Sequence, residues 1–175
     1  YREEIIPLAD ILKPNQFEAE ILTGIKITDI ESAVNAIDKF HSMGIRTVVL
    51  SSIDICTTKN DTRQLLSIVS SVQDKTKPRQ IYSISITRKE GTFIGTGDMF
   101  AALFLAWFTK SNFNAKETLE KVIATIQAII DRTSTAAKTL PGGVSRPGNI
   151  ELKIVQSRND IIVPPVSIVA TSVLL

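Results

Sequence analysis

The sequence predicts an α/β fold in which a mostly parallel β-sheet is flanked by helices. Short apolar runs typical of buried strands alternate along the chain with longer segments whose apolar residues recur every three or four positions, as on one face of a helix. Strands joined by helices favour right-handed crossovers, which produce parallel pairing. The 175 residues, 43% of them hydrophobic, are enough for a domain with its own core. We therefore expect residues 1–175 to form a single domain.

Two strands and two helices are predicted in the first part of the chain. Residues 9–12 form a short apolar strand, and residues 16–23 form a helix with Gly24 just beyond its C-terminus. A second helix covers residues 32–43, where the apolar residues fall on one face. The Val-Val-Leu run at residues 48–50 is typical of a buried strand.

Two more strands and two longer helices are predicted farther along the chain. Residues 65–72 and 81–86 are strand candidates, the second because polar and apolar residues alternate. Residues 99–108 are all apolar or nearly so, but fall well short of the roughly 20 residues that cross a bilayer, so they predict a buried core helix. A long helix follows, opened by a capping box that starts at Asn114. Residues 150–175 give no clear pattern.

The segment Gly95-Thr96-Gly97-Asp98, directly before the apolar helix, is the strongest sign of chemistry in the chain. Glycines let a backbone approach a phosphate, and the helix that follows turns unpaired N–H groups and its positive dipole end toward the anion. Asp98 is a poor electrostatic neighbour for a polyanion, which suggests that it accepts the proton of a hydroxyl that attacks a phosphoryl group. The alternative is that Asp98 only caps the helix.

Polar residues follow two other predicted strands, and we expect them on the same rim of the sheet as Asp98. Ligands of parallel sheets lie at the carboxyl ends of the strands. Asn15 and Glu18 follow the first strand, and Ser51 and Ser52 follow the strand at residues 48–50. An amide and a carboxylate three residues apart can hold Mg²⁺ and its waters near a triphosphate. Taken alone, such residues are more often helix caps.

Composition excludes several classes of partner. Twenty basic residues against 18 acidic ones give no overall field of the kind that gathers nucleic acid or an anionic membrane. A single cysteine, Cys56, allows no internal disulfide and no metal-binding cysteine cluster, which fits a cytoplasmic protein. A dinucleotide-binding GxGxxG motif would need glycine where Phe100 stands, and no GxxxxGK motif occurs.

Four segments resemble the pyridoxal kinases of the ribokinase superfamily. They are ADILKPNQFEAE at residues 9–20, HSMG at 41–44, GTGDMFAA at 95–102 and VQS at 155–157. The resemblance implies a ribokinase-like fold and transfer of the γ-phosphoryl group of ATP to the 5′-hydroxymethyl group of pyridoxal, pyridoxine or pyridoxamine. It also implies a cytosolic homodimer that uses Mg²⁺ and a monovalent cation, K⁺ or Na⁺.

The resemblance assigns a role to each residue of the expected rim. It implies that Asp98 is the catalytic base. The other residues would serve ATP and its metal, with Gly95, Thr96 and Gly97 at the phosphates, Ser51 and Ser52 at the nucleotide, and Asn15 with Glu18 at Mg²⁺. Lys13 stands where the family commonly has a threonine that resembles a monovalent-cation contact, so the lysine ammonium is a candidate substitute for that cation. The alternative is that Lys13 points to solvent and that other ligands still hold the cation.

The resemblance covers only the C-terminal part of the family's length. We expect the N-terminal part of the fold, which carries most pyridoxal contacts in the family, to be missing, and the isolated chain to have negligible kinase activity. Two alternatives stay open. One is a nucleotide-binding or dimerising fragment without turnover, and the other is a sister kinase that acts on another hydroxymethyl heterocycle.

Overall fold

A computed structural model describes residues 3–56, 63–73, 76 and 78–174. The chain divides into two compact units, the first comprising residues 1–86 and 170–175 and the second residues 87–169. That residues 1–175 form a single domain stays a prediction.

The first unit contains one five-stranded sheet, with its strands in the order β1-β2-β3-β4-β5. The strands are β1 (Ile11–Leu12), β2 (Thr47–Cys56), β3 (Arg63–Ser71), β4 (Gln80–Ile86) and β5 (Thr171–Ser172). Strands β1 and β2 are parallel, with Ile11 opposite Thr47. The β2–β3, β3–β4 and β4–β5 pairs are antiparallel.

The prediction of a mostly parallel sheet is therefore wrong for the described strands, although the α/β class is confirmed. The error lies in the length of β2, which was expected to end at Leu50 and instead continues to Cys56. Only residues 57–62 then separate β2 from β3, whereas a parallel crossover needs a dozen or more residues. The short connection favours the observed antiparallel pairing.

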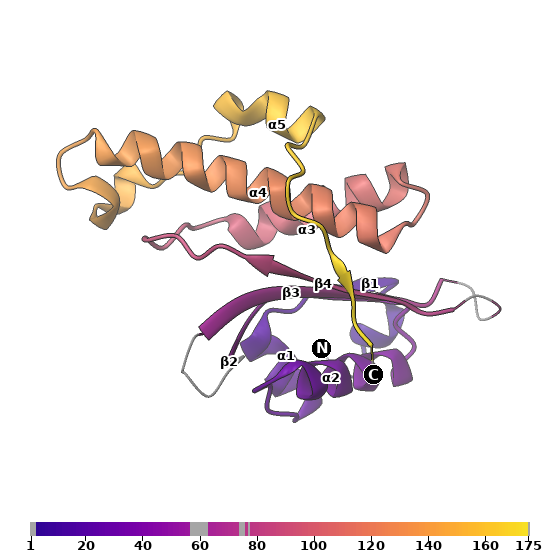
Figure 1. The fold of residues 1–175 in the computed structure, drawn as a ribbon. Helices are drawn as coiled ribbons and strands as arrows, with labels where there is room; N and C mark the ends of the chain where they lie inside the picture. The colour runs from indigo at the N-terminus through magenta and orange to yellow at the C-terminus, as the bar shows by residue number, and fades with distance from the viewer. Residues whose placement is uncertain (1–2, 57–62, 74–75, 77, 175) are drawn as a thin grey trace. The chain divides into compact units, whose positions relative to one another are not determined.

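Two helices of the first unit cover one face of this sheet (Figure 1). Helix α1 (Gln16–Thr23) has its predicted bounds and ends at Gly24, whose φ of 74° is in the left-handed region that favours glycine. Helix α2 (Ile30–Ser42) begins two residues earlier than predicted, because Asp29 is its N-cap. The helices and the sheet share a core whose largest fully buried side chains include Ile27, Ile37, Phe40, Leu50, Ile53 and Ile68.

The second unit consists of two long helices and short helical segments. Helix α3 (Thr96–Lys110) and α4 (Ala115–Lys138) form a helical hairpin, in which the rings of Phe104 and Phe108 stack at 5.2 Å between centroids. The apolar segment 99–108 is a helix with one buried face, so the predicted buried core helix is confirmed for that face only, and Ala101, Ala102 and Leu105 are exposed. Among the described residues, no helix combines the length and the apolar character needed to cross a membrane.

The capping box predicted at the start of α4 is only half formed. Asn114 Oδ1 accepts the N–H of Glu117 at 3.1 Å, but the Glu117 carboxylate pairs with Lys121 Nζ at 2.5 Å. After α4 come four short helical segments, η2 (Gly143–Ser145), η3 (Pro147–Asn149), η4 (Val155–Ser157) and α5 (Arg158–Ile162). Figure 1 shows α5 lying along α4, where Arg132 bonds to Ser157 and Asp160.

Candidate active site

Asn15 and Glu18 are brought together at the start of α1 as a reciprocal capping box. Asn15 Oδ1 accepts the N–H of Glu18 at 2.8 Å, and Glu18 Oε2 accepts the N–H of Asn15 at 2.8 Å. The alternative interpretation, that this pair caps the helix, is thus confirmed. It leaves the second carboxylate oxygen, Oε1, on an exposed side chain, so the pair can still offer an oxygen ligand to a hard cation.

Ser51 and Ser52 lie beside this capping box, but within a strand rather than after one. They occupy a register shift of the β2–β3 ladder between Leu50 and Ile53. The buried hydroxyl of Ser67 donates to the Leu50 carbonyl at 2.9 Å and so satisfies an oxygen at the interrupted ladder. The Ser51 N–H donates to the Pro14 carbonyl at 3.3 Å, which places Ser51 next to the segment that leads into Asn15.

Gln16 holds the start of α1 against β2, a role that the sequence analysis did not assign. Its Oε1 accepts the N–H of Asp54 at 2.8 Å, and its Nε2 donates to the Ile27 carbonyl at 2.9 Å. Because Gln16 follows Asn15 directly, these bonds also position the capping box. Lys13, just before Pro14, is half-buried and makes no hydrogen bond or ion pair with a described residue.

The turn before α3 differs from the starts of α1 and α4, where an asparagine side chain caps the helix. Gly95 is the N-cap, with a φ of 87°, and it has no side chain to accept the first N–H groups of the helix. Thr96 donates its hydroxyl to the Phe93 carbonyl at 3.2 Å, away from those N–H groups. The exposed Asp98 carboxylate lies in the first turn and makes no hydrogen bond or ion pair with a described residue. Asp98 is therefore not the helix cap, and first-turn amides remain available to an anion.

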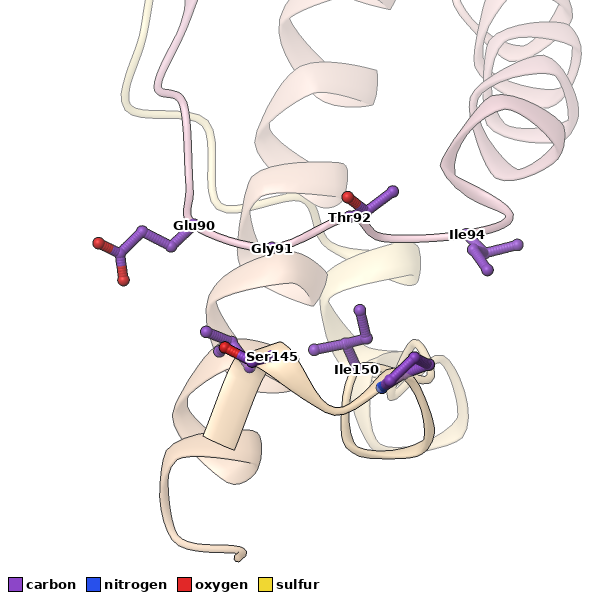
Figure 2. Close-up of a pocket in the computed structure, with 8 residues that line it drawn as sticks. Glu90, Gly91, Thr92, Ile94, Ser145 and Ile150 are labelled. Carbon is purple, nitrogen blue, oxygen red and sulfur yellow. The ribbon is translucent and has the colours of Figure 1, made fainter. Parts of the chain in front are cut away.

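A pocket of about 670 Å³ lies in the same unit, directly upstream of Gly95 in the chain. Figure 2 shows the loop at residues 90–94 facing the segment at residues 144–150 across it. The lining side chains include the apolar Ile94, Val144 and Ile150 and the hydroxyl-bearing Thr92 and Ser145.

The sequence analysis missed this pocket, because it joins segments about 50 residues apart. The turn residues Pro141-Gly142-Gly143 are typical of the end of a helix, but they do not indicate a partner for the segment that follows.

The candidate residues thus form two groups. Asn15, Glu18, Ser51 and Ser52 are neighbours in the first unit, whereas Gly95, Thr96, Gly97 and Asp98 lie in the second unit, next to the pocket along the chain. The convergence of the two groups on one rim stays a prediction. Among the residues that the structure describes, no three His, Cys, Asp or Glu side chains are grouped so that they could hold a metal ion. The prediction for Glu18 is a different arrangement, in which one carboxylate, waters and phosphates share the metal.

Comparison with known proteins identifies the family. The phosphomethylpyrimidine kinase family model matches residues 1–142. Pyridoxal kinase from Bos taurus is 39% identical over 176 residues, covering 98% of this chain and 56% of its own length. Pyridoxal kinase from Arabidopsis thaliana is 37% identical and covers 97% of this chain and 53% of its own length.

Solved structures agree with the sequence comparison. Pyridoxal kinase from Leishmania donovani in complex with ADP has a TM-score of 0.82 and 27% identity, covering 99% of this chain and 55% of its own. Pyridoxal kinase from Trypanosoma brucei has a TM-score of 0.73 and 32% identity, with 98% of this chain and 53% of its own covered. The chain spans about half the length of the relatives it matches. It belongs to the phosphomethylpyrimidine kinase family, and the relatives it resembles there are pyridoxal kinases.

Proposed function

We propose that the protein containing this chain transfers the γ-phosphoryl group of ATP to the 5′-hydroxymethyl group of pyridoxal, pyridoxine and pyridoxamine. The observation that carries the proposal is Asp98, an exposed carboxylate that has no partner among the described residues and lies at a helix start that has no side-chain cap. The relatives support the choice of reaction, because the Leishmania donovani enzyme was solved with ADP and pyridoxine and with ADP and pyridoxamine.

The described residues divide the chemistry between holding the phosphate and moving a proton. The first-turn amides of α3 would bind the transferred phosphoryl group, since unpaired N–H groups and the helix dipole both favour an anion there. Gly95 and Gly97 keep side chains away from it. Asp98 would take the proton of the attacking hydroxyl, which requires that hydroxyl to be held within about 3 Å of the carboxylate.

Magnesium is the metal that this site would use. Its fit is supported by the donor set, because Glu18 offers an exposed carboxylate oxygen and Mg²⁺ prefers oxygen ligands while keeping several waters. Glu18 and Asn15 would hold the ion and its waters. The ion would neutralise negative charge on the phosphates of ATP.

The pocket upstream of Gly95 is the part of the site that suits the base of the nucleotide. Ile94, Val144 and Ile150 offer apolar surface for an aromatic ring, and Thr92 and Ser145 offer hydroxyls for its polar edge. Gly95 links this pocket directly to the start of α3, where the phosphates would bind. Ser51 and Ser52, which belong to the first unit, are also proposed as ATP contacts.

Lys13 is proposed to supply the positive charge that a bound monovalent cation would supply in other members of the family. Lys13 is half-buried as a residue and has no partner among the described residues, which supports this role. An active enzyme carrying the chain should then need no potassium, and Lys13→Thr should restore activation by potassium. If potassium strongly activates the unsubstituted enzyme relative to a large inert cation, Lys13 does not replace the monovalent cation.

We further propose a cytoplasmic homodimer that acts on small molecules, with no nucleic-acid or membrane partner.

A sister kinase is the second candidate, because the matching family is described by a phosphomethylpyrimidine rather than by pyridoxal. The deciding experiment joins the N-terminal part of Bos taurus pyridoxal kinase to residues 1–175 and supplies ATP, Mg²⁺ and either pyridoxal or a hydroxymethylpyrimidine. We expect phosphate transfer to pyridoxal. Transfer only to the pyrimidine would favour the sister kinase, and nucleotide binding without transfer to either would favour a non-catalytic fragment. Residues 1–175 alone should have negligible activity.

A further inference from the structure

We propose that Asn149 is a positioning residue for nucleotide binding, which it serves by holding one wall of the pocket in Figure 2. The inference rests on the proposed function, because it takes this pocket as the nucleotide-base subsite. Asn149 as a residue is only 9% exposed, and its side-chain Nδ2 group donates to two carbonyls, those of Pro141 at 3.1 Å and Gly143 at 2.9 Å. Both amide hydrogens are thus used, and the loop from Pro141 to Asn149 is closed on itself.

The loop needs such a closure because two of its residues are glycines with left-handed backbones. Gly142 has a φ of 86° and Gly143 a φ of 53°. Glycine reaches these angles without strain, but it also loses the most conformational freedom when it is fixed in one of them. The two bonds from Asn149 lie on either side of Gly142, so they hold the least restrained part of the wall in one conformation.

Three residues that line one wall of the pocket follow the two ends of this closure closely in the chain. Val144 and Ser145 follow Gly143, and Ile150 follows Asn149, whereas Asn149 does not itself line the pocket. Its effect on a ligand therefore passes through these neighbours. A wall that is already ordered spares the ligand the free-energy cost of ordering it, which raises affinity without a new contact.

The opposite wall is held by a hydrogen bond from the Thr96 hydroxyl to the Phe93 carbonyl at 3.2 Å and by an ion pair. The loop at residues 90–94 follows Lys89, whose ammonium pairs with Asp131 of α4 at 2.7 Å. Both side chains are partly exposed, and ion pairs of this kind contribute little to stability. The closure at Asn149 is buried and bonds to backbone atoms, so we expect it to set the shape of the pocket.

The test measures binding of a fluorescent N-methylanthraniloyl derivative of ADP to the chimera described above. Asn149→Asp replaces the two donors with a carboxylate that faces two carbonyl oxygens, and we expect Kd to rise roughly tenfold. The KM for pyridoxal should stay unchanged, while the KM for ATP rises with Kd. Asn159→Asp is the matched control, because it makes the same chemical change on the exposed side chain of α5 and should leave Kd unchanged.

Two further variants keep the test decisive if Asn149→Asp fails to fold. Asn149→Ala removes the donors without adding charge, and Asn149→Gln keeps them on a longer stem, so Kd should be higher for alanine than for glutamine. An alanine variant that folds and binds like the unsubstituted chimera would overturn the inference and leave the proposed function standing. So would a variant that lowers Tm while Kd and both KM values stay unchanged. An unsubstituted chimera that binds no nucleotide would overturn the proposed function and the inference together.

Discussion

The starts of α1 and α3 carry the two most distinctive motifs of the chain, yet they treat their unpaired N–H groups in opposite ways. At α1, Asn15 and Glu18 satisfy each other's backbone amides at 2.8 Å. At α3, Gly95 offers no side chain, and neither Thr96 nor Asp98 bonds to the first turn. A helix start that closes itself contributes to stability, whereas one left open can bind an anion.

The other two long helices resemble α1 in this respect. Asp29 accepts the N–H of Ser32 at 2.8 Å at the start of α2, and Asn114 accepts the N–H of Glu117 at the start of α4. Of the helices α1 to α4, only α3 therefore begins without a side-chain cap, and the short α5 begins without one as well. An acid near a helix start is therefore a cap only if its side chain accepts a hydrogen bond from an N–H group of the first turn.

The largest expected effect is a loss of kcat on substitution of Asp98 at the start of α3. Asp98→Asn in an active chimera should lower kcat by about 10²- to 10⁴-fold, because the general base is lost, while ATP binding stays nearly intact. Steady-state kinetics and nucleotide binding check the two halves of this prediction. A variant with near-normal kcat would show that Asp98 is not the catalytic base.

Glu18→Gln should act through the metal rather than through the cap. Glutamine can still accept the N–H of Asn15, so the capping box and the stability should change little. The apparent affinity for Mg²⁺ should fall about 10- to 100-fold, and the loss of activity should shrink as Mg²⁺ is raised. Titration of activity with Mg²⁺ measures this. A defect of the same size at every Mg²⁺ concentration would argue against a metal role for Glu18.

The free energy of unfolding should depend more on the capping residues Asn15 and Asn114 than on Asp98. Asn15→Ala and Asn114→Ala should each lower the free energy of unfolding by about 1 kcal/mol, because each removes a cap. Asp98→Asn should lower it by less, since Asp98 accepts no bond from the helix. Urea denaturation compares the three variants. If Asp98→Asn proved the most destabilising of them, the contrast between the helix starts would fail.

The smallest expected effect concerns the charged cap of α2. Hydrogen bonds from the hydroxyl and the N–H of Ser32 hold the pKa of Asp29 below its ordinary value. A lowered pKa in the folded state means that this contribution to stability is present above the unfolded pKa and is lost as pH falls through the folded pKa. Ser32→Ala should raise the pKa of Asp29, as followed by NMR titration of its carboxyl carbon, but leave the backbone bond in place. An unchanged pKa would show that the hydroxyl contributes nothing.

Much of the candidate site could be predicted because its motifs are local. Asn15 with Glu18 and Gly95 with Asp98 are each at most three residues apart, so spacing alone places each pair on one helical turn. Ser51 and Ser52 were assigned from the end of a predicted strand, and the structure moves that end to Cys56. Burial of Ile53 and Ile55 within β2 depends on helices and strands elsewhere in the chain, so the run at residues 48–50 could not reveal it.

Residue patterns alone are sufficient to predict the α/β class, the bounds of α1, the apolar helix α3 and the glycine turn before it. These features depend on interactions within about one helical turn, which residue spacing encodes directly. Tertiary structure decided the antiparallel pairing of β2, β3 and β4, the neighbourhood of Ser51 and Pro14, and the pocket between residues 90–94 and 144–150. Each of these features joins segments that are far apart in the chain. The local pattern of either segment is compatible with several partners, so register and packing select the partner that is observed.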